Sequence, residues 1–528
     1  LQDSVVREGV ERERAAWAEP ELEALGEKTG RAAFIALGFQ ANENPPELKV
    51  FDRFGRRIDE VEYHPAYHQL MAAGVEAQVH AWPWNDSRPG AHVARAVAHY
   101  LLDQVEAGVG CPLTMTFAAV PALRHQPELA AEWVPRITST QYDPRMLPAV
   151  AKTGCLMGMA MTEKQGGSDV RANTTRALAL GAEGAGQEYH LTGHKWFCSA
   201  PMCDAFLTLA HTERGLSCFL VPRWLPDGTR NRFHIQRLKN KLGNKSNASS
   251  EIEYRDTYAR MVGEEGRGVP TIIEMVNHTR LDCTIGSAAM MRQALAQATH
   301  HCAHRGAFGK TLNAQPLMQN VLADLAVEWE AAATLMFRLA RGYDDSAQNP
   351  QAKAFTRLAT AVGKYWVCKR GPAMVYEALE CLGGGGYVEE SIMPRIYREA
   401  PLTSIWEGSG NVMCLDVLRA MRREPESVEA FMLELAQAKG ADARLDAHVA
   451  RLQAELGNLE DIECRARRVV EKMALALQGA LLVQHAPGMV ADAFCASRLA
   501  GDWGREYGSL PPGLPLQQLL LRATPALD

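Results

Sequence analysis

The stretch MAMTEKQGGSD, Met159–Asp169, opens the part of the chain in which apolar residues begin to alternate. Its first half predicts a β-strand that ends at Thr162, and the chain then turns through Gly166 and Gly167. Such a turn presents backbone N–H groups and the Ser168 hydroxyl at one place, which suits a phosphate or the polar edge of a ring. An ordinary glycine-rich hairpin turn is the alternative that this stretch alone leaves open.

Strand patterns continue from this turn to about residue 265. They occur in YHLTGHKWFC, AFLTLAH, LSCFLVP, RFHIQRL and SSEIEYRD, and turn-forming sequences such as LPDGT and KLGNKSN separate them. With CLMGMAM, which precedes the glycine-rich turn, they make six or seven short strands. This number and spacing predict a barrel or sandwich.

Helical periodicity flanks the strands on both sides. Before them, alanine-rich stretches such as AHVARAVAHYLLDQVEAG predict a helical domain with one long irregular insertion. After them, four long helical segments near 268–304, 315–342, 351–382 and 410–422 predict a helical bundle. The fold class is therefore mainly α with a central β-barrel. We predict four domains, at residues 1–155 (helical), 156–267 (β-barrel), 268–422 (helical bundle) and 423–528 (a further helical domain).

Composition excludes several classes of protein. The chain has 528 residues, of which 47% are hydrophobic and 22% charged, so it should fold into several cores. Its net charge of -6 gives no overall attraction to a phosphate backbone, and contact with nucleic acid would need a local basic patch. The N-terminal sequence LQDSVVREGVERERAAW is charged throughout, so we expect no secretory signal. No uncharged apolar run reaches the roughly 18 residues of a membrane helix.

Cysteine usage indicates the compartment. The twelve cysteines are spaced singly, without a C-x-x-C pair, which is typical of reduced thiols in a cytosol. We therefore expect a cytoplasmic protein. Six of the cysteines lie in segments that resemble strand or helix core: Cys155, Cys198, Cys218, Cys283, Cys302 and Cys368.

Two further motifs carry candidate chemistry. HKWFCSA places Trp196 and Phe197 beside Ser199 at the end of a predicted strand, where an aromatic ring could flank a planar cofactor, although a core aromatic is the commoner role. SIWEGSGN, residues 404–411, sets the single carboxylate of Glu407 between a tryptophan and a run of glycine and serine.

The order of the motifs resembles the acyl-CoA dehydrogenase family of flavoproteins. The motifs are M-T-E-x-x-x-G-S-D, G-x-K-x-[WF], R-x-x-F-G, L-G-G-x-G-Y and a Glu-Gly pair before a closing helix. Within the family the chain is most similar to the AidB branch of alkylation-response flavoproteins, through MTEKQGGSDVRANTTRA, LSCFLVPRWLPDG, KLGNKSNASSE and IWEGSGNVMCLDVLR. The resemblance implies a helical domain, a β-barrel, a four-helix bundle and an extra C-terminal helical domain, with FAD at their junction in a homotetramer.

The resemblance also implies the cofactor contacts. They fall on Met161, Thr162, Gly167, Ser168, Phe197, Ser199, Arg305, Phe308, Gln315, Gly384, Trp406, Gly408 and Asn411. Of these, Arg305, Phe308 and Gln315 match the group that reaches the FAD diphosphate of a neighbouring subunit, although Arg305 taken alone would be a solvated charge at a helix end. LGGGGY, residues 382–387, follows a predicted helix, so it is not a Rossmann fingerprint.

Glu407 falls on the family's catalytic base, which removes the α-proton of an acyl-CoA thioester while a hydride passes to flavin N5. A carboxylate against Trp406 and a flavin ring loses hydration, so we expect its pKa to be raised. The alternative is a glutamate near the N-terminus of a helix that begins at about Asn411. The family's other base position falls here on Thr279, which carries no acid.

Two arginines are assigned to the substrate pocket by the same resemblance, Arg280 and Arg419, although helix packing is an equal alternative for Arg280. The substrate would be an acyl-CoA or a related compound, and the sequence names no electron acceptor. A cofactor-free scaffold is hard to reconcile with so many matching glycine and hydroxyl positions. The pair His300 and His304 has the spacing of zinc ligands but no third ligand nearby, so we expect no metal site.

A second hypothesis is a flavoprotein that binds or protects double-stranded DNA during alkylation stress, with weak or vestigial dehydrogenase activity. It depends on a basic stripe at helical spacing, formed by Arg465, Arg467, Arg468 and Lys472. Against it, residues 422–528 carry twelve Lys and Arg but fifteen Asp and Glu. A solvated helix face is the alternative explanation of the stripe.

Overall fold

The computed structural model describes residues 3–525, and the chain falls into two compact units. Unit 1 comprises Leu1–Glu23, Pro89–Tyr100 and Arg280–Asp528, and unit 2 comprises Ala24–Arg88 and Leu101–Thr279. Three of the four divisions between the units fall inside helices, α2 (Glu19–Gly30), α6 (Ala91–Asp103) and α9 (Gly268–His304), and the fourth falls between Arg88 and Pro89. The boundaries of the four predicted domains stay predictions.

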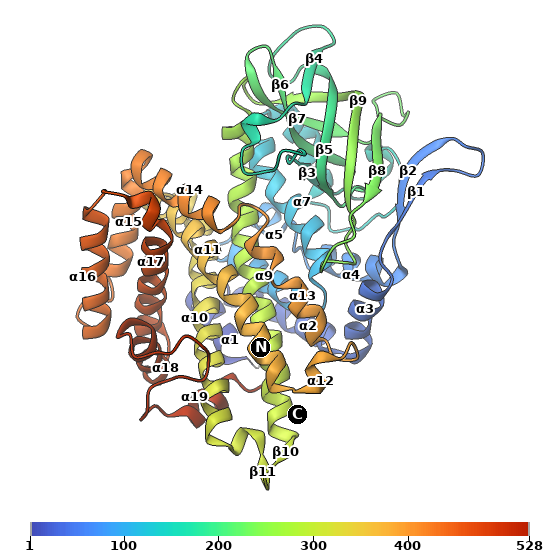
Figure 1. Cartoon of the computed structure of the whole chain (residues 1–528). Helices are drawn as coiled ribbons and strands as arrows, with labels where there is room; N and C mark the ends of the chain where they lie inside the picture. Colours follow the sequence, from blue (N-terminus) through green and yellow to red (C-terminus); the bar gives the residue numbers. More distant parts are fainter. Residues whose placement is uncertain (1–2, 526–528) are drawn as a thin grey trace. The chain divides into compact units, whose positions relative to one another are not determined.

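Unit 2 contains the predicted barrel (Figure 1). Its strands are β3 (Met157–Ala160), β4 (Arg176–Ala179), β5 (Glu188–Ser199), β6 (Ala205–Thr212), β7 (Gly215–Pro222), β8 (Phe233–Leu238) and β9 (Ser249–Val262). Within the described residues, five of them close a ring in the order β6, β4, β5, β9, β7, with β7 pairing back onto β6. β3 adds to β6 in parallel, and β8 adds to β9 antiparallel. The central β-barrel is therefore confirmed.

The barrel core follows from the alternation in its strands. β6 and β7 are buried along most of their length, whereas β5 alternates between buried and exposed residues. Inside the barrel, the ring centroids of Tyr189 and Phe219 lie 5.1 Å apart, and those of Phe206 and Phe233 lie 4.9 Å apart. The predicted segments all form strands; β4 was not predicted, because RALA is too short to show a period.

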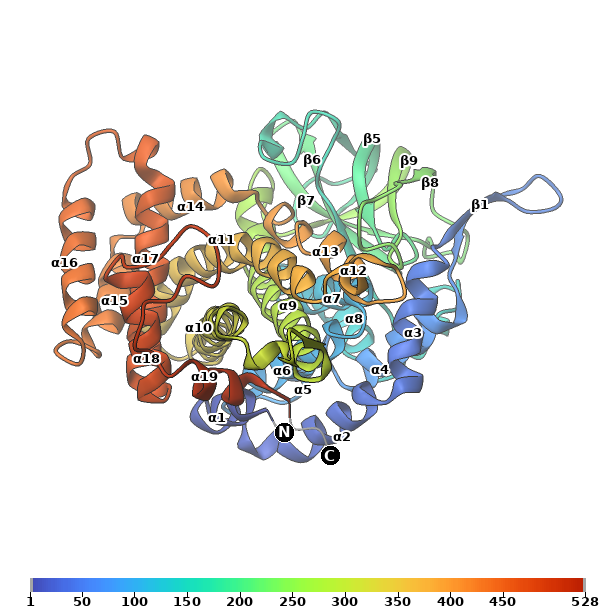
Figure 2. The ribbon, with the colours of Figure 1, turned by 60° about the horizontal axis from the view of Figure 1, so that its bottom comes forward.

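The predicted N-terminal helical domain, for which a long irregular insertion was expected, contains a β-hairpin that the sequence did not predict. β1 (Glu47–Phe51) pairs antiparallel with β2 (Arg57–Glu62), and Figure 2 shows this hairpin extending from the end of α3 (Ala32–Glu43). The Asp52 carboxylate closes the turn by accepting from the backbone N–H groups of Phe54 and Arg56 at 2.8 and 2.9 Å. An Asx-type bond of this kind favours a turn. The other helices of unit 2 are α4 (Pro65–Glu76), α5 (Trp82–Asn85), α7 (Gly110–Leu123) and α8 (Pro127–Ile137).

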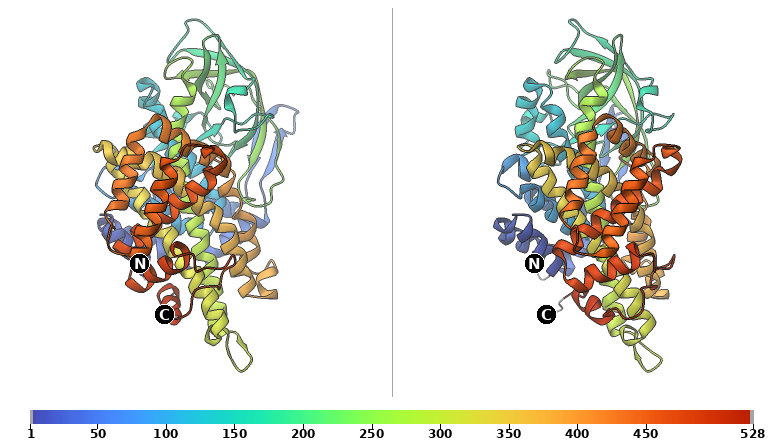
Figure 3. Two further views of the ribbon diagram at one scale, coloured as in Figure 1. Left: turned by 60° about the vertical axis from the view of Figure 1, so that its left-hand side comes forward. Right: turned by 90° about the vertical axis from the view of Figure 1, so that its left-hand side faces the viewer.

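Unit 1 is helical apart from one small hairpin. Its long helices α10 (Pro316–Ser346) and α11 (Pro350–Cys381) pack side by side, and α14 (Gly410–Arg423) and α15 (Pro425–Ala436) pack on α11. The two-residue strands β10 (Gly306–Ala307) and β11 (Lys310–Thr311) form a hairpin whose turn extends past the ends of α9 and α10 (Figure 3). The remaining helices are α1 (Ser4–Arg12), α12 (Gly384–Tyr387), α13 (Met393–Glu399), α16 (Ala443–Gly457), α17 (Ile462–His485), α18 (Gly488–Phe494) and α19 (Leu516–Ala523).

The four predicted bundle segments correspond to α9, α10, α11 and α14 within a few residues, and the predicted helices after residue 423 are present. All twelve cysteines are free thiols; Cys464 is exposed and the other eleven are buried, including the six predicted to lie in the core. Among residues 3–525, no helix has both the length and the apolar character needed to span a bilayer.

Candidate functional site

Glu407 lies in a tight turn between a short 3-10 helix, Leu402–Ser404, and α14. Its backbone has a φ of 58°, in the left-handed region that residues other than glycine rarely adopt. Gly408 follows with a φ of 112°, a backbone conformation that strongly favours glycine, and a Cβ there would lie 2.5 Å from the end of the Met413 side chain. α14 begins at Gly410, so Glu407 lies in the turn immediately before this helix and outside it.

Two side chains from neighbouring helices bind the carbonyl groups of this turn. Lys364 Nζ, on α11, donates to the carbonyl of Trp406 at 2.8 Å and to the carbonyl of Gly408. Arg280 Nε, on α9, donates to the carbonyl of Glu407 itself at 3.1 Å. Lys364 was not predicted from the sequence. Its signal was one lysine inside the apolar run TAVGKYWVC, and it is only 1% exposed.

Arg280 is also part of a buried ion cluster. Its Nη1 lies 2.8 Å from the carboxylate of Asp416 on α14, and both Nη atoms of Arg357 lie 3.1 Å from the same carboxylate. Burial alone would raise the pKa of Asp416, but Arg280 and Arg357 outweigh it and lower this pKa. Arg419 is 3.7 Å from Asp416 and 60% exposed. Arg280 on α9 thus contacts both α14 and the Glu407 turn, and its assignment to the substrate pocket stays a prediction.

In unit 2, a buried carboxylate anchors the predicted flavin loop. Glu163 accepts hydrogen bonds from the backbone and hydroxyl of Thr174 and of Thr175, at 2.6 to 3.1 Å, and from Lys195 Nζ at 2.9 Å. Burial opposes its ionisation, but Lys195 and the donors prevail and lower the pKa of Glu163 to about 2. This Glu163–Lys195 pair was also not predicted. It fixes the loop immediately after Thr162.

The predicted flavin contacts of unit 2 come together at the ends of two strands. Met161 and Thr162 follow β3, and the Thr162 carbonyl accepts from the backbone N–H of Trp196 in β5 at 2.8 Å. A Cβ on Gly167 would lie 2.6 Å from the Thr162 hydroxyl, so the loop closes tightly on that side chain. Ser168 is exposed on the same loop.

Strand β5 carries the other two predicted flavin contacts of unit 2, Phe197 and Ser199. Its register with β9 shifts between Lys195 and Cys198, as in a β-bulge, which redirects the intervening side chains. Phe197, one of these, is 49% exposed, and Lys239 Nζ lies 4.7 Å from its ring. The hydroxyls of Ser199 and Ser249 are 3.2 Å apart. A half-exposed aromatic ring therefore lies beside hydroxyl groups at this edge of the barrel.

In unit 1, Phe308 is in the turn of the β10–β11 hairpin, Arg305 immediately precedes β10, and Gln315 precedes α10. Phe308 and Gly309 have φ values of 52° and 78°, the two positive values of a type I′ turn. The Gln315 amide donates to the Ala307 carbonyl at 3.1 Å and ties the turn to α10. Phe308 is 98% exposed at the tip.

The glycine run after α11 begins with Gly383 at a φ of 57°, and α12 starts at Gly384. A Cβ on Gly384 would meet nothing within 4 Å, so this run presents open backbone. Asn411, in the first turn of α14, accepts from Arg467 Nε at 2.8 Å. One residue of the basic stripe is therefore bound to the start of α14, three to four residues beyond Glu407.

The rest of the basic stripe is paired with a single carboxylate. Glu455, on α16, lies 2.8 Å from Arg468 Nε, 3.8 Å from Arg465 Nη1, and within hydrogen-bonding distance of Lys472 Nζ. Arg465 also donates to the carbonyls of Asn458 and Glu460, both at 2.7 Å. Most of the charge on this face is thus engaged within the chain.

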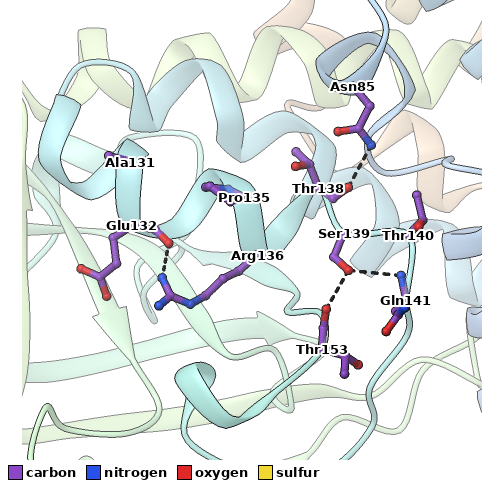
Figure 4. Close-up of a pocket in the computed structure, with 10 residues that line it drawn as sticks. All are labelled: Asn85, Ala131, Glu132, Pro135, Arg136, Thr138, Ser139, Thr140, Gln141 and Thr153. Carbon is purple, nitrogen blue, oxygen red and sulfur yellow. Dashed lines mark hydrogen bonds between the residues drawn. The ribbon is translucent and has the colours of Figure 1, made fainter.

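Two other features, a histidine pair on α9 and a hollow beside α8, lie outside the predicted flavin and base contacts. The rings of His300 and His304 are 4.4 Å apart, but no group of three His, Cys, Asp or Glu side chains in residues 3–525 is placed to hold a metal ion. An open hollow of about 920 Å³ lies beside α8 in unit 2, and Figure 4 shows its polar groups bonding within the chain. Asn85 donates to the Thr138 carbonyl, and Ser139 donates to the Thr153 carbonyl.

Comparison with known families matches three parts of the chain. Residues 1–144 match the adaptive response protein AidB N-terminal domain, residues 158–257 the acyl-CoA dehydrogenase middle domain, and residues 266–422 the acyl-CoA dehydrogenase C-terminal domain.

Individual proteins give the same result. The acyl-CoA dehydrogenase-type protein AidB of Escherichia coli K12 is 47% identical over 526 residues, which cover 99% of this chain and 95% of that protein. Acyl-CoA dehydrogenase family member 11 of Caenorhabditis elegans is 33% identical over 85% of this chain and 77% of its own length. The crystal structure of C. elegans ACDH-11 in complex with C11-CoA superimposes with a TM-score of 0.82, at 28% identity, over 99% of this chain and 91% of that one.

Proposed function

Because the chain belongs to the acyl-CoA dehydrogenase family, in its AidB branch, we propose that it is an FAD-dependent oxidoreductase that acts on the CH–CH bond of an acyl-CoA or a related compound. The observation that carries this proposal is the Glu407 turn. In this turn Glu407 has a left-handed backbone conformation, and the carbonyl groups of the turn accept hydrogen bonds from Lys364 and Arg280.

The residues present fit a flavin. At the barrel edge, Thr162, Ser168 and Ser199 offer hydroxyl groups, and the exposed face of Phe197 offers an apolar ring. The Gly383–Gly385 backbone and the Arg305 guanidinium suit the adenine and diphosphate parts of FAD. When bound, FAD would supply the acceptor for a hydride from the substrate β-carbon.

In this proposal Glu407 takes the α-proton of the thioester onto its carboxylate oxygen. An α-proton is weakly acidic, so the base must be aimed at it within hydrogen-bonding reach, which a rigid turn favours over a mobile side chain on a loop. Trp406 would shield the carboxylate from water. The acyl-CoA class of substrate is supported by the C11-CoA complex of the C. elegans relative.

Replacing the carboxylate tests this function. Glu407→Gln keeps the side-chain shape but removes the base. We expect the variant to purify with yellow flavin absorbance and to lose the anaerobic bleaching that an active acyl-CoA produces in the parent. A protein that cannot be loaded with FAD, or a Glu407→Gln variant that bleaches at the parental rate, would contradict the proposal.

We also propose that the protein is a homotetramer. Its support is the exposed hairpin, because contact with a neighbouring copy would bury Phe308, which is 98% exposed, and would bring Arg305 toward that copy's cofactor.

DNA binding in the response to alkylation is the second proposal, and its support is the basic stripe together with the match of residues 1–144 to the adaptive response protein AidB N-terminal domain. The Glu455 pairing weakens it, because that carboxylate compensates the same cations that would contact phosphates. Retention on duplex DNA over a salt series tests it, since contact through Z phosphates gives a log–log slope of about -0.9Z. The absence of retention at low salt would remove the proposal.

A further inference from the structure

The turn that carries Glu407 is fixed through its backbone. Its three successive carbonyls, at residues 406, 407 and 408, all accept hydrogen bonds from buried side chains on other helices. A turn at a protein surface ordinarily leaves such carbonyls to water. Here Lys364 supplies two of the bonds and Arg280 the third.

We propose that Lys364 and Arg280 are positioning residues, which hold the Glu407 turn in the one backbone conformation that aims its carboxylate. The inference rests on the proposed role of Glu407 as the base. It adds that the direction of the Glu407 carboxylate depends on the Lys364 ammonium and the Arg280 guanidinium. Neither residue needs to touch substrate or cofactor to act in this way.

The backbone angles show why the turn needs these bonds. An L-residue in the left-handed region is disfavoured because its Cβ approaches the following carbonyl oxygen. A return of Glu407 to an ordinary negative φ would swing its side chain and rotate the flanking peptide planes. Because the carbonyls on both sides are bound to Lys364 Nζ, that rotation would break both bonds.

The two donors are themselves held in place. Lys364 is 1% exposed on α11, and an ammonium group offers three hydrogens, enough for both carbonyls. Arg280 is held by Asp416 at 2.8 Å, and Asp416 is held in turn by Arg357. Through these contacts, residues of α9, α11 and α14 together hold the turn in place.

Hydrogen exchange tests the proposal without reference to catalysis. In the turn, the amides of Ile405 and Trp406 donate to the Leu402 carbonyl at 2.9 and 3.1 Å, so they report its opening. In the full-length, FAD-loaded protein, Lys364→Met should speed their exchange by at least about ten-fold. Lys353→Met is the matched control, because Lys353 is an exposed lysine on the same helix, and it should leave their exchange unchanged.

Flavin reduction gives the second readout. We expect Lys364→Met to keep FAD and its acyl-CoA dissociation constant, but to lose about 10²-fold in the rate of anaerobic flavin reduction, since a small misplacement of a reacting group has that effect. If Lys364→Met does not fold, Lys364→Gln, which retains an amide donor, should show the same two changes to a smaller degree.

The outcomes separate this inference from the function on which it rests. Parental exchange and a parental rate in the Lys364 variants, with Glu407→Gln inactive, would overturn the positioning role and leave the base intact. Faster exchange in Lys364→Met, with Glu407→Gln fully active, would support the fastening of the turn and overturn the role of Glu407. Faster exchange with a parental rate would show that the fastening does not aim the base, which contradicts the inference.

Discussion

Replacing Lys195 by methionine tests how the barrel holds its predicted flavin loop. In the native protein Lys195 Nζ donates to Glu163 at 2.9 Å and to the Leu209 carbonyl at 2.8 Å, and neither side chain of the pair is exposed. Methionine has the same length but no charge, so the variant leaves the Glu163 carboxylate buried without its cation.

The expected loss of unfolding free energy is about 3 to 5 kcal/mol, the usual result of removing one partner from a buried ion pair. The pKa of Glu163 gives a consistent figure. Its value of about 2 lies below the ordinary 4.5, and a difference of this size corresponds to about 3 kcal/mol. Burial also lowers the pKa of Lys195 to about 8, so the cation contributes a cost of its own, and the pair as a whole adds little net stability.

The direction of the Glu163 pKa shift determines how the stability should depend on pH. Glu163 stabilises the fold above pH 4.5, and the contribution is lost as the pH falls toward 2. In Lys195→Met the native pKa of Glu163 should rise toward or above its unfolded value, so the variant lacks this contribution at neutral pH, and its difference in unfolding free energy from the parent should shrink as the pH falls toward 2. The double variant Glu163→Gln/Lys195→Met should be more stable than Lys195→Met alone, because no unpaired charge remains buried.

Urea unfolding at pH 7, with hydrogen exchange followed in peptides from β5 and β9, measures the change within the barrel. Lys49→Met, at an exposed position on β1, serves as the control. A loss below about 1 kcal/mol, or a double variant no more stable than the single one, would refute the argument that the pair is coupled and buried.

Three further predictions concern the other parts of the site. Gly408→Ala should destabilise the Glu407 turn by about 1 to 3 kcal/mol and slow flavin reduction, because its φ of 112° is strained for any residue with a Cβ; a parental rate would contradict the geometry. Phe308→Ser should shift the protein toward smaller species in light scattering if the hairpin tip contacts a neighbouring copy, and an unchanged mass would show that the tip is not an essential contact. Glu455→Gln should strengthen retention on duplex DNA at low salt, because it frees the basic stripe; weaker or equal retention would count against a role of the stripe.

The fold could be predicted from periodicity because most elements bury one regular face. β5 alternates between buried and more exposed residues, β6 and β7 are short buried runs bounded by turns, and the four bundle helices are long. The β1–β2 hairpin was missed because its strands are charged and only partly buried, so no apolar face marks them.

The site was predictable only in part. Glu407 could be placed by its motif, but its left-handed backbone depends on Lys364 and Arg280, which lie far away in the sequence. A lysine in a helix is usually solvated, so only its apolar neighbours could have indicated that Lys364 is buried. Glu163 is part of the M-T-E motif, yet its link to Lys195 becomes visible only when β5 lies beside the loop.

Ring closure makes β9 the last strand that the barrel requires during synthesis. β5, β6 and β7 leave the ribosome first, and β5 and β7 both pair with β9, which ends at Val262. At about 5 to 20 residues per second, the interval between the ends of β5 and β9 lasts roughly 3 to 13 s. During that time the nascent chain exposes unpaired strand edges rich in apolar residues. Such edges can pair with strands of other chains and cause aggregation. The newly made barrel should therefore depend on chaperone protection in this interval more than the helical parts do.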